Sequence, residues 1–245
     1  MRDEDQAEII CEEKRMSNKM VEFKSNGGMA QGYLAVPAGG AQGPGVIVIQ
    51  EWWGLVPHIE NVAERFAAAG FVALAPDLYH GRSTTSPDEA GKLMMALNIE
   101  EAEKDLCGAI QYLLAHESVA GERVGTIGFC MGGALSLYAA SKNEQVGACV
   151  VFYGGHPKVV PDLENLRAPV LGHYAERDTF ATPEGARELE AKLKSLGKPV
   201  EIHIYEDADH AFFNDDRPEV YKPDAAAAAW ERTINFLRER LSGQA

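Results

Sequence analysis

Long apolar runs are absent from this sequence, and so is any excess of basic residues. No stretch is long enough to cross a bilayer, and the opening segment is too charged to be the hydrophobic core of a secretory signal. Against 37 acidic residues there are only 23 Lys and Arg, which gives a formal net charge of −14. This charge repels phosphate backbones and anionic lipid surfaces. We therefore expect a cytoplasmic protein with no nucleic-acid or membrane partner.

Cysteine is also scarce, with four residues and no CxxC pair. Widely spaced cysteines in a chain of this length favour reduced thiols over a disulfide framework or a zinc site. Cys107 lies in a helical pattern and Cys149 in a strand-like run, where each is expected to be a small buried apolar residue, while Cys11 lies in the N-terminal segment. The pattern implies no metal and no organic cofactor, and it leaves Cys130 as the one thiol with an unusual setting.

The length and composition predict one domain preceded by an extension. A chain of 245 residues with 46% hydrophobic residues can bury one sizeable core. Residues 1–20 show no clear period and are expected to form a flexible extension, with a single domain over residues 21–245. That domain opens with two strand-like segments joined by Asn26-Gly27, a strong hairpin signal.

Strand-like and helical patterns then alternate, which is typical of a mostly parallel sheet with helices on both faces. Ser86-Pro87, Asn98 and Thr182-Pro183 match signals for helix starts, and Gly70 and Gly197 match signals for helix ends. The apolar strand candidates are VIVIQ, VALAPD, VGTIGF, ACVVFYG, PVLGHYA and VEIHIYE. With the hairpin, they predict an eight-stranded α/β fold.

The segment GFCMGG combines an apolar strand, a glycine-rich corner and an immediate helix start. This is the context of a nucleophile elbow, with Cys130 in the place where a serine is usual. A thiol there becomes a useful nucleophile when a base and an orienting acid converge on it.

An acid and a histidine follow the later strands in the order nucleophile, acid, histidine, which is that of α/β-hydrolases. Asp178 falls in the turn after PVLGHYA, where its carboxylate can reach a histidine ring. Glu176, Asp207 and Asp209 lie near enough in the sequence to remain alternatives.

His210 lies in the loop after the last strand and is the histidine best placed to act as the base. The alternation of His203 with isoleucines predicts an outward strand position. The remaining histidines considered are His58 and His116, at expected helix boundaries, and His156 and His173, whose roles stay open.

The ordered motifs QEWWGL, APDLYHGR, GFCMGG, ERD and DHAFFND follow successive strands. Together they resemble the dienelactone hydrolase family over residues 21–241. The resemblance implies an α/β-hydrolase fold and a triad of Cys130, His210 and Asp178. It also implies cleavage of a lactone or ester through a cysteinyl acyl-enzyme.

Glu51 follows the first parallel strand, at the position of a glutamate that, in the family resembled, hydrogen-bonds the resting cysteine and becomes its base when substrate binds. A carboxylate beside a thiol disfavours the thiolate by like-charge repulsion. We therefore expect a protonated resting thiol, with a surface glutamate as the alternative. The expected oxyanion donors are the backbone N–H groups of Trp52 and Met131.

Substrate contacts are expected from Arg82, Arg217, Trp53 and Phe212. The family's substrate carries a carboxylate, and Arg82 in PDLYHGR lies close to the family's carboxylate-binding position, displaced by His80-Gly81. Arg217 lies later than the family's second arginine, and either arginine is otherwise a solvated surface residue. Trp52 and Trp53 form either a wall over the site or ordinary packing under a loop.

The expected reaction is hydrolysis of a carboxylated enol lactone, of the type that converts dienelactone to maleylacetate, by a monomer or homodimer. A broad carboxylesterase or thioesterase with the same triad is the first alternative. A redox-sensing or binding protein in which Cys130 is oxidised without turnover is the second.

Overall fold

The computed structural model describes residues 18–25 and 27–241. The first two strands are antiparallel, and their register pairs Ser25 with Gly28, which confirms the expected tight hairpin. The first strand begins at Lys19, inside the segment expected to be an extension. Residues 1–17, the rest of that segment, lie outside the described residues.

Eight strands form one sheet in the order β1-β2-β4-β3-β5-β6-β7-β8. β1 pairs with β2 and β2 with β4 in antiparallel fashion, and every later pairing is parallel. The mostly parallel sheet with an N-terminal hairpin is therefore confirmed. The strands are β1 (Lys19–Ser25), β2 (Gly28–Ala35), β3 (Gly43–Ile49), β4 (Val72–Pro76), β5 (Val119–Phe129), β6 (Val146–Phe152), β7 (Val170–Ala175) and β8 (Val200–Tyr205).

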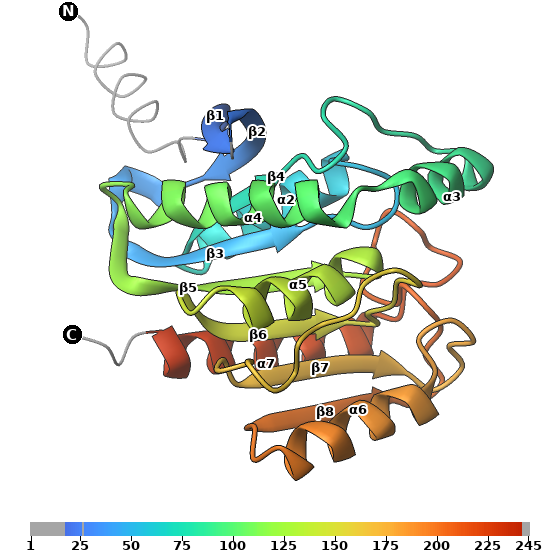
Figure 1. Cartoon of the computed structure of the whole chain (residues 1–245). Helices are drawn as coiled ribbons and strands as arrows, with labels where there is room; N and C mark the ends of the chain where they lie inside the picture. Colours follow the sequence, from blue (N-terminus) through green and yellow to red (C-terminus); the bar gives the residue numbers. More distant parts are fainter. Residues whose placement is uncertain (1–17, 26, 242–245) are drawn as a thin grey trace, which may run out of the picture.

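Helices cover both faces of the sheet: α4 and α5 lie on one face and α2 and α7 on the other (Figure 1). Parallel strands buried on both faces are accordingly apolar throughout, and Val46 to Ile49 of β3 are fully buried. None of the described helices is long and apolar enough to span a membrane. The helices are η1 (Ala38–Gly40), α2 (Pro57–Ala68), α3 (Pro87–Ala96), α4 (Ile99–Leu114), α5 (Met131–Lys142), α6 (Pro183–Ser195) and α7 (Pro223–Leu241).

Most of the expected helix boundaries are present. The Asn98 side chain caps α4 by accepting from the N–H groups of Glu100 and Glu101, and the Thr182 hydroxyl caps α6. Ser86 precedes α3 without a side-chain cap bond. Gly70 and Gly197 follow their helices with φ of 93° and 68°, the left-handed conformation expected after a helix end.

The junction of β5 and α5 is packed backbone against backbone. A Cβ at Gly128 would lie 1.8 Å from the carbonyl oxygen of Gly132. A Cβ at Gly132 would lie 2.4 Å from the carbonyl oxygens of Ile49 and Gln50 at the end of β3. The glycines of GFCMGG are therefore required by close approach, and they fix the start of α5 against the carboxyl ends of the strands.

This packing predicts that Gly132→Ala destabilises the fold, because the new methyl group meets backbone that cannot rotate away. We expect a loss of about 2–3 kcal/mol in the free energy of unfolding, measured by urea denaturation. Gly91→Ala in α3 is the matched control, since its Cβ would meet only the Trp52 ring at 3.9 Å. Greater helix propensity should leave that variant unchanged or up to about 1 kcal/mol more stable. Equal effects of both substitutions would contradict the packing argument.

Candidate active site

A pocket of about 280 Å³ is lined by residues that follow the carboxyl ends of parallel strands. These strand ends lie at one edge of the sheet (Figure 1). Ligand sites in open α/β sheets occur at this edge. Its walls include Glu51 after β3, Cys130 after β5, Asp178 after β7, and His210 and Arg217 after β8. The pocket therefore brings together all four residues that the sequence predicts to be catalytic.

Cys130 occupies a strained corner between β5 and α5. Its φ is 54° and its ψ is −118°, a conformation that residues with a side chain rarely adopt. The backbone N–H of Cys130 donates to Phe152 at 3.0 Å, and its carbonyl accepts from Gly155 at 3.2 Å. The residue is 7% exposed and lines the pocket. This is the geometry that presents a nucleophile at the N-terminus of a helix.

Asp178 and His210 form a partly buried hydrogen-bonded pair. His210 Nδ1 lies 2.6 Å from Asp178 Oδ2. The other carboxylate oxygen of Asp178 accepts from the N–H groups of Phe180 at 2.8 Å and Ala181 at 2.9 Å. With its side chain fully buried and both oxygens bonded, Asp178 holds the imidazole ring in one orientation.

The electrostatic setting of His210 favours its charged form. Burial by itself lowers the pKa of this ring, but hydrogen bonds to Asp178 and to the Cys130 side chain outweigh burial and raise the pKa to about 10. The ring is therefore protonated at neutral pH, with Asp178 on one side and the Cys130 side chain on the other. The sequence does not reveal how closely this ring approaches both partners.

Glu51 lies in the same pocket but is bonded to another residue. It is 2% exposed, and its Oε2 accepts from Asn214 Nδ2 at 2.8 Å. No hydrogen bond joins Glu51 to Cys130 among residues 18–25 and 27–241. The alternative of an exposed surface glutamate is excluded by its burial. The expected bond to the resting thiol is likewise not present, because Asn214 holds the carboxylate instead.

Tyr153 lies behind the pocket, next to the ring of His210. It is fully buried with a φ of 38°, and its ring centroid is 5.0 Å from that of His210. Burial, followed by the charges of Glu51 and Cys130, raises the pKa of the phenol well above its ordinary value. Within the described chain its hydroxyl has no partner of good hydrogen-bond geometry. The phenol therefore stays neutral and is a free donor beside Glu51.

The two expected oxyanion donors belong to adjoining backbone segments. Met131 is the first residue of α5, and Trp52 follows the end of β3, against which α5 packs. In the part of the chain that the structure describes, neither N–H has an acceptor. Both groups are therefore available to a ligand, as an oxyanion hole requires.

The structure separates the two candidate arginines. Arg217 lines the pocket, where its guanidinium carbon lies 5.8 Å from the Trp53 ring centroid and its Nε lies 2.9 Å from Glu219. Arg82 lines a different pocket, beside Leu97 and Glu101. The structure therefore does not bring Arg82 to Cys130, and the inserted His80-Gly81 turn explains the displacement, since both of these residues have positive φ.

The aromatic candidates also differ in placement. Trp52 and Trp53 both line the pocket, with ring centroids 5.0 Å apart, so they form part of its wall. Phe212 is fully buried behind the pocket, 5.5 Å from the Tyr153 ring centroid, and supports the site from below. Sequence reasoning missed Phe180 and Met94, which also line the pocket. The position of Phe180 two residues after Asp178 is a signal from which it could have been found.

The acids that remained alternatives to Asp178 have other partners. Glu176 accepts from the backbone N–H of Asp207, and Asp207 pairs with Arg177 at the surface. Glu176, Asp207 and Asp209 are all absent from the lining of the pocket that contains Cys130.

The two histidines with open roles lie outside the pocket. His173 is fully buried between Tyr205 and Thr233, whose hydroxyls lie 2.9 and 3.0 Å from its nitrogens. His156 lies 3.2 Å from the carbonyl oxygen of Met94. Both rings are therefore held by structural contacts. Cys107, Cys130 and Cys149 are free thiols, and Cys11 lies outside the described residues.

The sheet and this pocket define an α/β-hydrolase fold with a cysteine at the nucleophile elbow. A model of the dienelactone hydrolase family matches residues 30–241, and the chain belongs to that family of ester and lactone hydrolases. "Protein usf" of Aquifex pyrophilus is 38% identical and covers 91% of this chain and 99% of its own. A protein named "Putative carboxymethylenebutenolidase" from Aquifex aeolicus is 34% identical over the same shares.

The fold is also found in solved structures. The crystal structure titled "Putative Dienelactone Hydrolase" from Klebsiella pneumoniae matches with a TM-score of 0.84 and 27% identity. It covers 92% of this chain and 99% of that one. Because the match covers nearly the full length of both chains, the two proteins share the fold that forms the pocket.

The raised pKa of His210 predicts the alkaline limit of ester hydrolysis. A ring that keeps its proton up to about pH 10 can donate that proton to a leaving group up to that pH, so activity should fall only as pH rises through about 10. Asp178→Asn removes a carboxylate that raises this pKa. The limit should move to lower pH, and kcat should fall about a hundredfold or more. The measurement is the pH profile of kcat/KM for p-nitrophenyl acetate.

Asp207→Asn is the matched control, because that carboxylate faces Arg177 at the surface. It should leave both the profile and kcat close to those of the parent. An alkaline limit that stays in place in Asp178→Asn would show that the pair does not set the charge of His210.

Proposed function

We propose that this protein hydrolyses a small ester or lactone through a thioester formed on Cys130. The observation that carries the proposal is the 2.6 Å pair of Asp178 and His210 in contact with the elbow thiol, inside a pocket of about 280 Å³. A nucleophile, a base and a residue that orients the base are the parts that acyl transfer needs. The family to which the chain belongs supports the same reaction class.

The first step is attack of the Cys130 thiolate on the carbonyl carbon, which forms a tetrahedral intermediate. The N–H groups of Trp52 and Met131 stabilise its oxyanion. The intermediate then collapses to the thioester as the carbon–oxygen bond to the leaving group breaks, and the imidazolium of His210 gives its proton to that oxygen.

The second step returns the enzyme to its resting state. The now neutral His210 takes a proton from a water molecule, whose oxygen attacks the thioester carbonyl at the same oxyanion site. The carbon–sulfur bond breaks, the carboxylic acid product leaves, and Cys130 regains its thiolate beside a protonated His210. Asp178 keeps the ring oriented through both steps, because its other oxygen is fixed by two backbone N–H groups.

The substrate that fits this pocket best is a small lactone or ester with a carboxylate. Most of the lining is apolar, with aromatic walls from Trp52, Trp53 and Phe180, while Arg217 adds a cation at the same pocket. A guanidinium group beside an apolar wall favours a substrate that has an apolar body and a carboxylate, because it forms charge-assisted hydrogen bonds to carboxylates. We therefore favour a dienelactone-like enol lactone, the substrate type named for the relative from Aquifex aeolicus.

Removal of the nucleophile gives a direct test. Cys130→Ala should abolish turnover of both lactones and p-nitrophenyl esters, because the elbow supplies the attacking atom, while circular dichroism and Tm stay near those of the parent. Cys130→Ser should be severely impaired, because a serine hydroxyl does not form the ion pair with His210. Cys149→Ala, at a buried thiol outside the pocket, is the control and should retain activity. Residual turnover above about a tenth in Cys130→Ala would overturn the mechanism.

The two arginines provide a test of substrate class. Arg217→Gln should raise KM for a carboxylated lactone by about tenfold or more, as expected for loss of a hydrogen bond to a charged group worth ~1.5–3 kcal/mol. It should change KM for p-nitrophenyl acetate by less than about twofold. Arg82→Gln makes the same change in the neighbouring pocket and should leave both values unaltered.

Equal losses on charged and neutral substrates in Arg217→Gln would indicate a broad esterase with a damaged wall. A selective loss in Arg82→Gln would instead assign the carboxylate to the position that the sequence first suggested.

A further inference from the structure

A second group of chemically active side chains lies outside the catalytic pocket, at the start of α2. His58, the second residue of that helix, is 3% exposed, and both of its ring nitrogens are buried. Neither nitrogen has a hydrogen bond within residues 18–25 and 27–241. A buried imidazole whose nitrogens make no hydrogen bond is costly, so its position favours a ligand.

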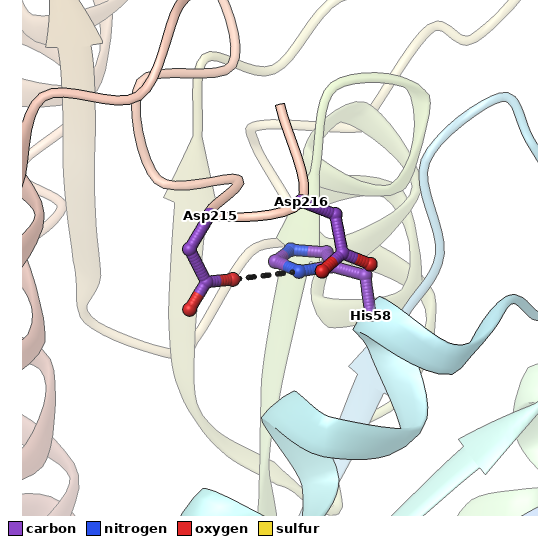
Figure 2. A group of neighbouring side chains, drawn as sticks. All are labelled: His58, Asp215 and Asp216. Carbon is purple, nitrogen blue, oxygen red and sulfur yellow. Dashed lines mark ion pairs between the residues drawn. The ribbon is translucent and has the colours of Figure 1, made fainter. Parts of the chain in front are cut away.

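Two consecutive carboxylates face this ring from the loop after β8. Figure 2 shows Asp215 and Asp216 on either side of the imidazole. One ligand atom from each of His58, Asp215 and Asp216 lies within 4.8 Å of the others. His58 Nδ1 is 3.1 Å from Asp215 Oδ1, close enough for an ion pair, although the geometry of a hydrogen bond is not met. The ring and carboxylate are thus close without being bonded to each other.

The surroundings of the three side chains are acidic and open to solvent. They line a pocket of about 410 Å³ that Glu60 and Glu64 also line. Clustered carboxylates repel one another, and a divalent cation relieves that repulsion. The nearby cation Arg65 acts on Asp215 from a distance, since its guanidinium lies over the Phe213 ring at 4.8 Å and makes no ion pair in the described chain.

We propose that His58, Asp215 and Asp216 bind one divalent transition-metal cation, of which Zn²⁺ is the representative. Two ligand atoms that are each about 2.1 Å from a metal stand about 3.0 Å apart at a right angle and about 3.4 Å apart at the tetrahedral angle. The distance of 3.1 Å between His58 Nδ1 and Asp215 Oδ1 lies within this range. The Asp216 carboxylate is exposed and free to close on the same ion. Water from the pocket completes the coordination.

The donor set selects the class of metal. An imidazole nitrogen suits zinc and its first-row neighbours, whereas Ca²⁺ and Mg²⁺ take oxygen ligands. Three protein ligands leave at least one coordination position of the cation for water, and the neighbouring carboxylates favour a positive charge at this site. The described ring has no alternative hydrogen-bond partner to hold it away from the metal.

The site has a consequence for the catalytic pocket. Asp215 and Asp216 lie between Asn214, which bonds Glu51, and Arg217, which lines the pocket. A metal held by the two carboxylates and by His58 therefore joins the start of α2 to the segment that carries both pocket residues. The inference goes beyond the proposed function and does not depend on it, because metal binding is measured without turnover.

The experiment measures Zn²⁺ binding to the full chain after metal is removed with a chelator. It uses both the parent and Cys130→Ala, because a reactive thiol is itself a zinc ligand. Isothermal titration calorimetry should give one strong site in Cys130→Ala, with a Kd on the order of micromolar or below. At a hundredfold excess of free Zn²⁺ over Kd, Tm should rise by roughly 5–10 °C. Co²⁺ should bind without a thiolate charge-transfer band.

The variant that removes both carboxylates decides the assignment. Asp215→Asn with Asp216→Asn should lose the site and the rise in Tm, and both positions are exposed, so the fold should be retained. Glu117→Gln with Glu122→Gln makes the same change of charge at exposed positions near the start of β5 and should bind as the parent does. His58→Gln should likewise lose zinc binding.

Three results would overturn the proposal. They are the absence of a strong site in Cys130→Ala, unchanged zinc affinity in the Asp215 and Asp216 double variant, and binding of Ca²⁺ or Mg²⁺ in preference to Zn²⁺. A preference for Ca²⁺ or Mg²⁺ would show that His58 is not a ligand, because the imidazole nitrogen is the reason for expecting Zn²⁺.

Discussion

The contact between the end of β5 and the start of α5 is the constraint on which the site depends. Cys130 reaches the pocket from a backbone conformation that an ordinary turn would not hold, and it does so because α5 begins directly against the carbonyl groups of β3. Gly128 and Gly132 allow that approach. The strain is held by rigid elements on both sides, so the thiol, the helix N-terminus and the loop after β3 keep one relative position.

Two buried carboxylates in the same pocket have opposite surroundings. Asp178 accepts two backbone N–H bonds and faces a protonated ring, so its charge is compensated and orients His210. Glu51 instead accepts from the side-chain amide of Asn214 and lies near the neutral phenol of Tyr153. The two carboxylates therefore differ in the groups that hold them in place.

The sequence was sufficient for the features that depend on local pattern. Alternating apolar runs predicted the sheet, and the glycine-rich corner after a strand predicted the elbow at Cys130. The position of Asp178 beyond β7 distinguished it from Asp207, which faces the surface. The structure places Cys130 and Asp178 in one pocket because the ends of parallel strands meet at one edge of the sheet, so a position along the chain becomes a position in space.

Features that depend on loop conformation were beyond the sequence. Both Arg82 and Arg217 were expected to contact the substrate, but the turn at His80-Gly81 carries Arg82 to another pocket. Two further contacts join residues that are distant in the chain and share no periodic pattern. They are the bond between Asn214 and Glu51 and the cluster of His58 with two aspartates.

The central claim is that Cys130 and His210 form an ion pair. The most direct test is the rate at which iodoacetamide alkylates Cys130 as a function of pH, followed by mass spectrometry. The account predicts fast alkylation through neutral pH in the parent and in Glu51→Gln, and a large loss of rate in His210→Gln. Slow alkylation that rises about tenfold per pH unit through the neutral range, as for an ordinary thiol, would contradict it and would return Glu51 to the role of the activating base.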